Sequence, residues 1–101
     1  MASRLDLQTL LENLLGSRNV YFQPPSTLKM KYPAIRYELS SIDNVHADNS
    51  VYAQNNRYKI TLIDYDPDSE YVGKLSRLAK CSMNNTYPAD GLNHWVFNLY
   101  F

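Results

Sequence analysis

Residues 58–70, with the sequence YKITLIDYDPDSE, join an alternating segment to an acidic turn. The alternation of apolar and polar residues extends over residues 57–65 and predicts a half-buried strand. Asp66 can cap a helix, Pro67 suits its first position, and the acidic residues after them favour the positive end of the helix dipole. This stretch therefore predicts a strand that leads directly into a helix.

The sequence before this stretch predicts one helix and one short strand. Ser3 can cap a helix in which leucines recur at helical spacing, and Gly16 can end it. Residues 19–23 are rich in aromatic and β-branched side chains, and Pro24 and Pro25 then remove two successive backbone donors. These features are typical of a short strand at the edge of a sheet.

Residues 32–39 and 40–56 differ in pattern. The first segment alternates, with Ile35 and Tyr37 on the face predicted to meet the core. The second is rich in Ser, Asp and Asn, which prefer turns and local hydrogen bonds. It therefore predicts a long loop, and loops longer than about 12 residues in a compact domain are usually functional or mobile.

The C-terminal third predicts a helix followed by two strands. The helix carries apolar residues at helical spacing, namely Val72, Leu75, Leu78 and Ala79. Residues 81–86 are a strand candidate and residues 88–91 form a turn. Residues 92–101 alternate with bulky side chains on both faces, which places this strand inside a sheet.

Together these segments follow the order α-β-β-β-α-β-β. The order lacks strict alternation of strands and helices, and residues 1–101 are too few for a second core. We therefore expect one α+β domain over residues 1–101, with a mostly antiparallel or mixed sheet of roughly four to five strands and two helices on one side. Tyr21, Tyr37 and Tyr58 are expected to pack in its core.

The charge distribution is balanced overall and uneven along the chain. Lys and Arg number 10, as do Asp and Glu, so the chain lacks the broad positive field of a duplex-binding protein. Residues 38–70 carry seven acidic and two basic side chains, whereas both flanking segments are net positive. Two interpretations are open: simple scatter of charges over the surface, or contacts between like subunits through opposite charges. The lone Cys81 suits a reducing compartment, and neither a signal peptide nor a membrane span is indicated.

The candidate chemical groups do not combine into a reactive site. Acidic residues alternate over residues 64–70 like the start of a calcium-binding loop, but Ser69 and Leu75 stand where that motif needs Gly and Glu. Helix capping is the favoured interpretation of this cluster. The two histidines and the cysteine lack positioned partners. We expect no catalytic residue, no metal site and no cofactor.

Three segments together resemble a known family. They are KYPAIRYELS at residues 31–40, the acidic stretch within residues 57–75, and the aromatic segment at residues 92–101. In this combination the chain resembles the small tail-terminator, or tail-completion, proteins of tailed bacteriophages. The resemblance implies an α/β protein that forms a hexameric ring on the last ring of the tail tube, stops tube growth and presents a surface to the head connector or stopper. It also implies a central channel for DNA, a place in the virion after assembly in the host cytoplasm, and no catalytic residues.

In such a ring, function depends on interfaces. The long predicted loop is expected to face the lumen or a neighbouring ring, where its negative balance suits a channel that must not retain DNA. The candidate interface or lumen residues are Asp43, His46, Asp48, Arg36, Glu38, Arg57 and Lys59. The edge strand near residues 20–23 and the C-terminal strand are alternative contacts, because unpaired backbone invites another subunit.

Two other functions stay open from the sequence. One is a head-completion or connector protein of the same neck region, which is also small and ring-forming. The other is a small regulator that binds nucleic acid or protein. A sixfold oligomer without salt-sensitive DNA affinity would favour the ring, and a DNA-binding monomer would favour the regulator.

Overall fold

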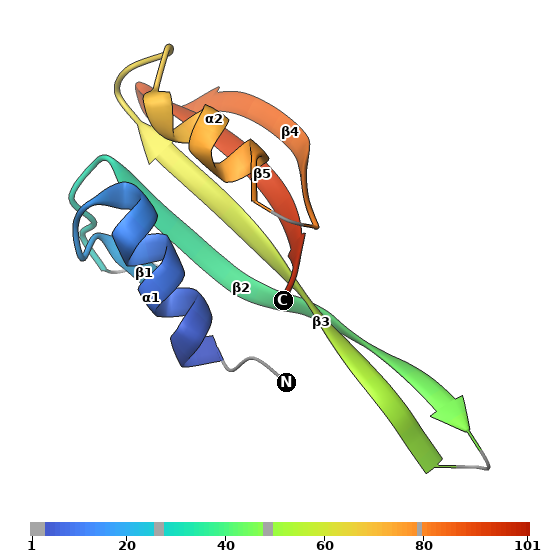
Figure 1. Cartoon of the computed structure of the whole chain (residues 1–101). Helices are drawn as coiled ribbons and strands as arrows, with labels where there is room; N and C mark the ends of the chain where they lie inside the picture. The colour runs from blue at the N-terminus through green and yellow to red at the C-terminus, as the bar shows by residue number, and fades with distance from the viewer. Residues whose placement is uncertain (1–3, 26–27, 48–49, 79) are drawn as a thin grey trace.

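The structure is a computed structural model that describes residues 4–25, 28–47, 50–78 and 80–101, without the side chains of residues 43–55. Its elements follow in the order α1 (Arg4–Leu15), β1 (Val20–Phe22), β2 (Ala34–Ala47), β3 (Ser50–Asp64), α2 (Glu70–Ser76), β4 (Cys81–Ala89) and β5 (Leu92–Tyr100). They form the expected α+β fold, with a five-stranded sheet and two helices (Figure 1).

The five strands form one mixed sheet with the order β1-β2-β3-β5-β4. β1 runs parallel to β2, and the other neighbouring pairs are antiparallel. Both helices cover the same face of the sheet, and no described helix covers the opposite face, which we call the open face (Figure 1). β1 lies at a sheet edge and β5 lies inside the sheet, so both of these predictions are confirmed.

The hydrophobic core lies between the sheet and the two helices. It joins leucines of both helices to inward side chains of the strands: Leu7, Leu11, Leu15, Val20, Ile35, Tyr37, Tyr58, Ile60, Leu62, Leu75, Trp95, Phe97 and Leu99. The Tyr37 hydroxyl donates to Gln8 Oε1 (2.5 Å) and accepts from Arg4 Nη1 (3.2 Å). These bonds satisfy a polar group inside the core, while burial raises the pKa of the Tyr37 hydroxyl.

Tyr21 departs from the core prediction. Its partner in the parallel β1–β2 ladder is Arg36, so Tyr21 lies on the open face, whereas Val20 reaches the core. The Tyr21 hydroxyl accepts a hydrogen bond from the backbone N–H of Lys31 (3.4 Å). The prediction was wrong because a strand of three residues is too short to show the alternation of apolar and polar residues that indicates which side faces the core.

The predicted long loop at residues 40–56 is also wrong, because this segment forms a paired β-ribbon. The ladder between β2 and β3 continues through Ile42↔Asn56 to Ala47↔Ser50. The β3–β5 register begins at Arg57, and the Phe101 N–H donates to the Asn56 carbonyl (2.9 Å), so the described residues 42–47 and 50–55 pair only with each other beyond Ile42↔Asn56. We call these two segments the β-arm. Polar, turn-prone residues form strands here because backbone pairing alone does not require an alternating apolar pattern.

The β-arm extends well beyond the rest of the molecule. Figure 1 shows the paired ends of β2 and β3 projecting away from both helices and from β5. The molecule accordingly measures 51 × 27 × 23 Å along its principal axes. A register shift between Leu39 and Ser41 marks the base of the arm, and such bulges bend and twist a ribbon locally.

Helix α2 begins later than the sequence predicted. The backbone N–H of Asp66 donates to Asp64 Oδ1 (3.2 Å), and that of Asp68 donates to Asp66 Oδ1 (2.9 Å). These two turns use the carboxylates that were expected to cap the helix, so Ser69 takes the N-cap position and Glu70 starts the helix. The helix ends at Ser76, so Leu78 follows it, and Ala79 lies outside the described residues.

Positive φ angles occur at two predicted boundaries. Gly16 follows α1 with a φ of +75°, as expected of a helix-ending glycine. Asp90 and Gly91 have φ values of +52° and +72°, which suits a two-residue hairpin turn between β4 and β5. The predicted turn at residues 88–91 is therefore shorter than expected. Pro88 lies within β4, where a sheet edge tolerates its missing donor.

Trp95→Ala should strongly destabilise the fold. Trp95 is only 8% exposed and belongs to the core cluster, so its truncation removes a large buried surface and leaves a cavity. We expect a loss of about 3–5 kcal/mol in the free energy of unfolding. Urea denaturation followed by circular dichroism measures it. A midpoint equal to that of the unsubstituted chain would contradict the core role of Trp95.

Candidate functional site

Alternation along β2 and β3 brings polar side chains together on the open face. Arg36 pairs in register with Thr61, and Glu38 pairs with Lys59. Lys59 Nζ lies 4.0 Å from Glu38 Oε1, and both side chains are nearly half exposed. Such an ion pair contributes about 0–1 kcal/mol. Arg36 is exposed and has no ion-pair partner among the described residues, so its charge is available to another molecule.

An aromatic stack forms the adjoining part of the open face. Tyr87 of β4 and His94 of β5 are cross-strand partners, with ring centroids 4.9 Å apart and an interplanar angle of 11°. Thr86 Oγ1 donates to the backbone carbonyl of His94 (3.0 Å). His94 Nδ1 is buried without a hydrogen-bond partner among the described groups, so it retains unused hydrogen-bonding capacity.

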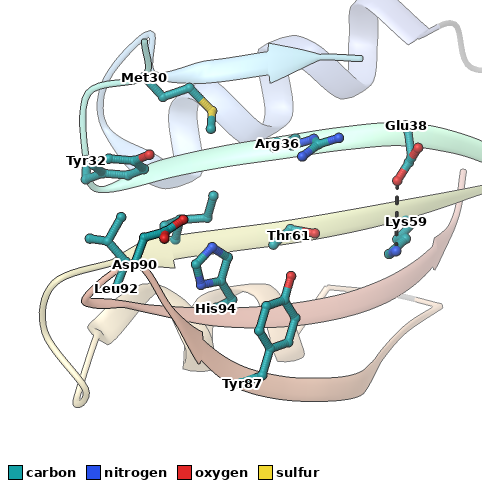
Figure 2. Close-up of a pocket in the computed structure, with 11 residues that line it drawn as sticks. Met30, Tyr32, Arg36, Glu38, Lys59, Thr61, Tyr87, Asp90, Leu92 and His94 are labelled. Carbon is teal, nitrogen blue, oxygen red and sulfur yellow. Dashed lines mark ion pairs between the residues drawn. The ribbon is translucent and has the colours of Figure 1, made fainter. Parts of the chain in front are cut away.

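These groups line a pocket of about 280 Å³ on the open face. Its remaining lining comes from the segment before β2, from β3 and from the β4–β5 turn: Met30, Tyr32, Ile63, Asp90 and Leu92. Figure 2 shows the charged groups Arg36, Glu38 and Lys59 at one end, with Tyr87 and His94 beside them. Because Ile63 and Leu92 are buried, the pocket has an apolar floor, with Arg36, Glu38 and Lys59 toward one end and the carboxylate residue Asp90 toward the other (Figure 2).

The structure brings together three of the seven residues predicted for an interface or lumen. Arg36, Glu38 and Lys59 all line the open-face pocket. Arg57 lies further along β3, where its Nη2 donates to Ser40 Oγ at 3.5 Å. Arg57 is therefore placed at the base of the β-arm, outside the pocket lining.

Of the other three predicted residues, Asp43 and His46 belong to the β-arm. The backbones of Asp43 and His46 pair with Asn55 and Val51 within the β-arm. Their side chains lie outside the structural description, as does the whole of Asp48. Asp43 and His46 thus lie on a different part of the molecule from Arg36, Glu38 and Lys59.

Sequence reasoning missed the aromatic part of the pocket. His94 could have been found, because its alternation with Trp95 assigns it to the face opposite the core. Tyr87 gave no such signal. A register shift between Met83 and Asn85 changes the face that later β4 residues present, and nothing in the local sequence marks it.

The site offers surface chemistry for recognition. Cys81 pairs with Leu99 and packs against the core, and burial raises the pKa of its thiol. It is therefore not part of the open-face pocket. Within the described part of the chain, no group of three His, Cys, Asp or Glu residues is placed to hold a metal ion. The available interactions are ion pairing at Arg36, stacking on Tyr87 and hydrogen bonding at His94.

Comparison of the chain with models of protein families, with curated proteins and with solved structures gave no significant match. Neither described helix is long and apolar enough to cross a membrane.

The Cys81 thiol should titrate at a higher pH in the folded protein than in the unfolded chain. Its raised pKa means that the thiolate, which is the reactive form, is less populated at any pH near neutrality. We expect the pH midpoint of iodoacetamide alkylation to move upward on folding. The control is the same chain unfolded in about 8 M urea. A folded midpoint at or below the unfolded one would contradict the prediction.

Proposed function

We propose that this protein is a structural subunit of a phage virion that forms a hexameric ring on the end of the tail tube. The ring caps the finished tail, stops its growth and presents a surface to the head connector or stopper protein. DNA passes through its central channel without specific binding. The subunit assembles in the host cytoplasm and stays at the junction of tail and head, and its role includes no catalysis, cofactor or membrane.

The β-arm is the observation that supports this proposal most directly. Beyond Ile42↔Asn56, the two strands have only each other as described neighbours. An isolated two-stranded ribbon is marginally stable in water, because it buries little apolar surface. Its outer edges also present unpaired backbone groups that favour pairing with another chain. A subunit in a ring would have neighbours that cover the arm, which explains why such an extension is useful.

The sheet offers further contact surfaces at both ends. β4 is an edge strand whose central residues are exposed, and it includes the exposed apolar side chains Met83 and Tyr87. β1 forms the opposite edge and covers only residues 35–37 of β2. Two unlike edges suit a head-to-tail arrangement, in which rotation from one subunit to the next closes a ring. The family resemblance of residues 31–40, 57–75 and 92–101 sets the expected ring order at six.

Loss of the protein should change tail length. Phage that lack its gene are expected to produce overlong or polydisperse tails in negative-stain images, because tube growth is no longer stopped. A reconstruction of complete virions should show six copies at the head-proximal end of the tail. Normal tails lying beside filled heads would instead assign the protein to head-to-tail joining, and one or two copies per particle would exclude the ring.

Shortening the β-arm should separate folding from assembly. Residues 44–54 are replaced by Asn-Gly, which can turn directly between the paired residues Asp43 and Asn55. We expect the melting temperature to change by less than about 5 °C, equivalent to roughly 1 kcal/mol, because the core residues are untouched. Ring assembly and infectivity should be lost.

Asn44→Ala serves as the matched control, because it changes a residue of the arm and keeps the arm at full length. It should retain both assembly and infectivity. Full infectivity of the shortened variant would remove the β-arm from the proposed function. A shortened variant that does not fold would show instead that the arm belongs to the stable core.

A further inference from the structure

The charges of the open-face pocket are separated between its two ends. At one end Lys59 pairs with Glu38, which leaves the exposed Arg36 without an ion-pair partner among the described residues. Asp90 lies toward the other end, is exposed, and likewise has no ion-pair partner within the described part of the chain (Figure 2). The lining therefore carries no net charge, but it presents one unpaired cation and one unpaired anion at opposite ends.

The sheet holds these two unpaired groups apart. Arg36 shares a row of the sheet with Thr61 and Val96. Asp90 lies in the β4–β5 turn, which leads into Leu92. Val96 and Leu92 are four residues apart on β5, which corresponds to about 13 Å at about 3.3 Å per residue. The two charges therefore stay apart and leave room between them for a ligand.

An apolar floor lies between the charged ends. It is formed by the buried side chains of Ile63 and Leu92. Such a floor favours methylene groups or a ring over a polar chain, because their contact with it removes apolar surface from water. The pocket volume of about 280 Å³ lies just below the range of about 300–1,000 Å³ that is usual for small-molecule sites. These dimensions suit a small molecule with an apolar middle.

Aromatic rings at the Asp90 end favour a cation there. The ring of Tyr32 lines the pocket and meets Tyr65 edge-on, with centroids 5.7 Å apart and an interplanar angle of 85°. Figure 2 shows Tyr32 and His94 at the same end as Asp90. Because the faces of tyrosine rings attract cations, an ammonium group at this end meets a carboxylate together with ring surface.

We propose that the open-face pocket binds a small zwitterion whose ammonium and carboxylate groups are separated by an apolar chain or ring. The carboxylate pairs with the guanidinium of Arg36, whose forked donors match two oxygens, and the ammonium pairs with Asp90. The apolar middle lies on Ile63 and Leu92. This class includes ω-amino acids and excludes α-amino acids, whose charged groups are too close together to reach both ends. The site does not depend on ring formation, so this inference goes beyond the proposed function.

A set of matched probes tests the site on the purified full chain. ε-Aminocaproic acid has a chain of methylene groups between its ammonium and its carboxylate, caproic acid lacks the ammonium, and pentylamine lacks the carboxylate. Isothermal titration calorimetry and the ring resonances of Tyr32 and His94 should show saturable binding of ε-aminocaproic acid. Caproic acid and pentylamine should each bind at least about tenfold more weakly, because each loses one charge-assisted interaction. Glycine should bind no better than these two. The absence of a saturable ring shift, or equal affinity for glycine, would overturn the proposal.

Substitutions at the two ends identify which ligand group each end binds. Asp90→Asn keeps a residue that tolerates the φ of +52° and removes the negative charge. It should weaken binding of ε-aminocaproic acid about tenfold and leave the affinity for caproic acid unchanged. Arg36→Gln should likewise weaken ε-aminocaproic acid and leave pentylamine unchanged.

Two control variants make the same chemical changes elsewhere. Asp68→Asn and Arg18→Gln alter exposed residues outside the pocket lining, and both should keep the full affinity for ε-aminocaproic acid. Melting temperatures show whether each variant is folded. Unchanged affinity in folded Asp90→Asn and Arg36→Gln, or an equal loss in the control variants, would overturn the assignment of the two ends.

Discussion

The antiparallel ladder between β2 and β3 is the constraint on which the rest of the structure depends. It runs without interruption by another element from Ala34↔Ile63 to Ala47↔Ser50. In the half that contains residues 34–39, β1 adds to the outer edge of β2 and β5 adds to the outer edge of β3. On the inner face of the sheet, α1 packs over β1 and β2, and α2 packs over β5 and β4. The other half is the β-arm, so one pair of strands defines both the body and its extension.

Along these strands, side chains that pack in the core alternate with side chains that line the open-face pocket. Ile35 and Tyr37 point into the core, whereas Arg36 and Glu38 line the pocket on the open face. Adjacent residues of one strand therefore carry out different tasks and can vary independently, because their side chains share no environment. The ion pair on the open face is too exposed to stabilise the domain appreciably, so its charges contribute little to folding.

The elements that could be predicted from the sequence are those with a strong local pattern. Examples are the leucine stripe of α1, the alternation of residues 57–65 and the bulky residues on both faces of β5. Each of these elements buries a surface, so its apolar residues recur at a regular spacing in the sequence. The β-arm shows no such spacing, because its two strands satisfy their backbone hydrogen bonds by pairing with each other and need no apolar face to do so. The start of α2 was misplaced for a related reason: capping and turn formation both use an aspartate that accepts from a nearby backbone N–H.

Part of the candidate site was predictable, because successive side chains of a strand lie on alternate faces of the sheet. Arg36, Glu38 and Lys59 line one pocket because regular alternation along β2 and β3 places them on the face opposite the core; their interface role stays a prediction. Tyr87 joins them only through the irregular register of β4, which depends on tertiary pairing with β5. The prediction for Asp43, His46 and Asp48 rested on a long loop at residues 40–56 that was expected to face the lumen or a neighbouring ring. In the structure the backbones of Asp43 and His46 belong to the paired strands of the β-arm, outside the pocket.

The continuity of β2 and β3 from body to arm has a mechanical consequence. A pull on the arm along its length acts parallel to the strands, and the hydrogen bonds of the ladder lie across that direction. Because β2 and β3 are pulled in the same direction, the load passes along both backbones into the body, where the hydrogen bonds that join β2 to β1 and β3 to β5 share it in shear. The register shifts between Leu39 and Ser41 and between Val45 and His46 are points where such a ribbon bends and twists. Tension on the arm would thus be transmitted directly into the five-stranded sheet, with lateral compliance concentrated at these two shifts.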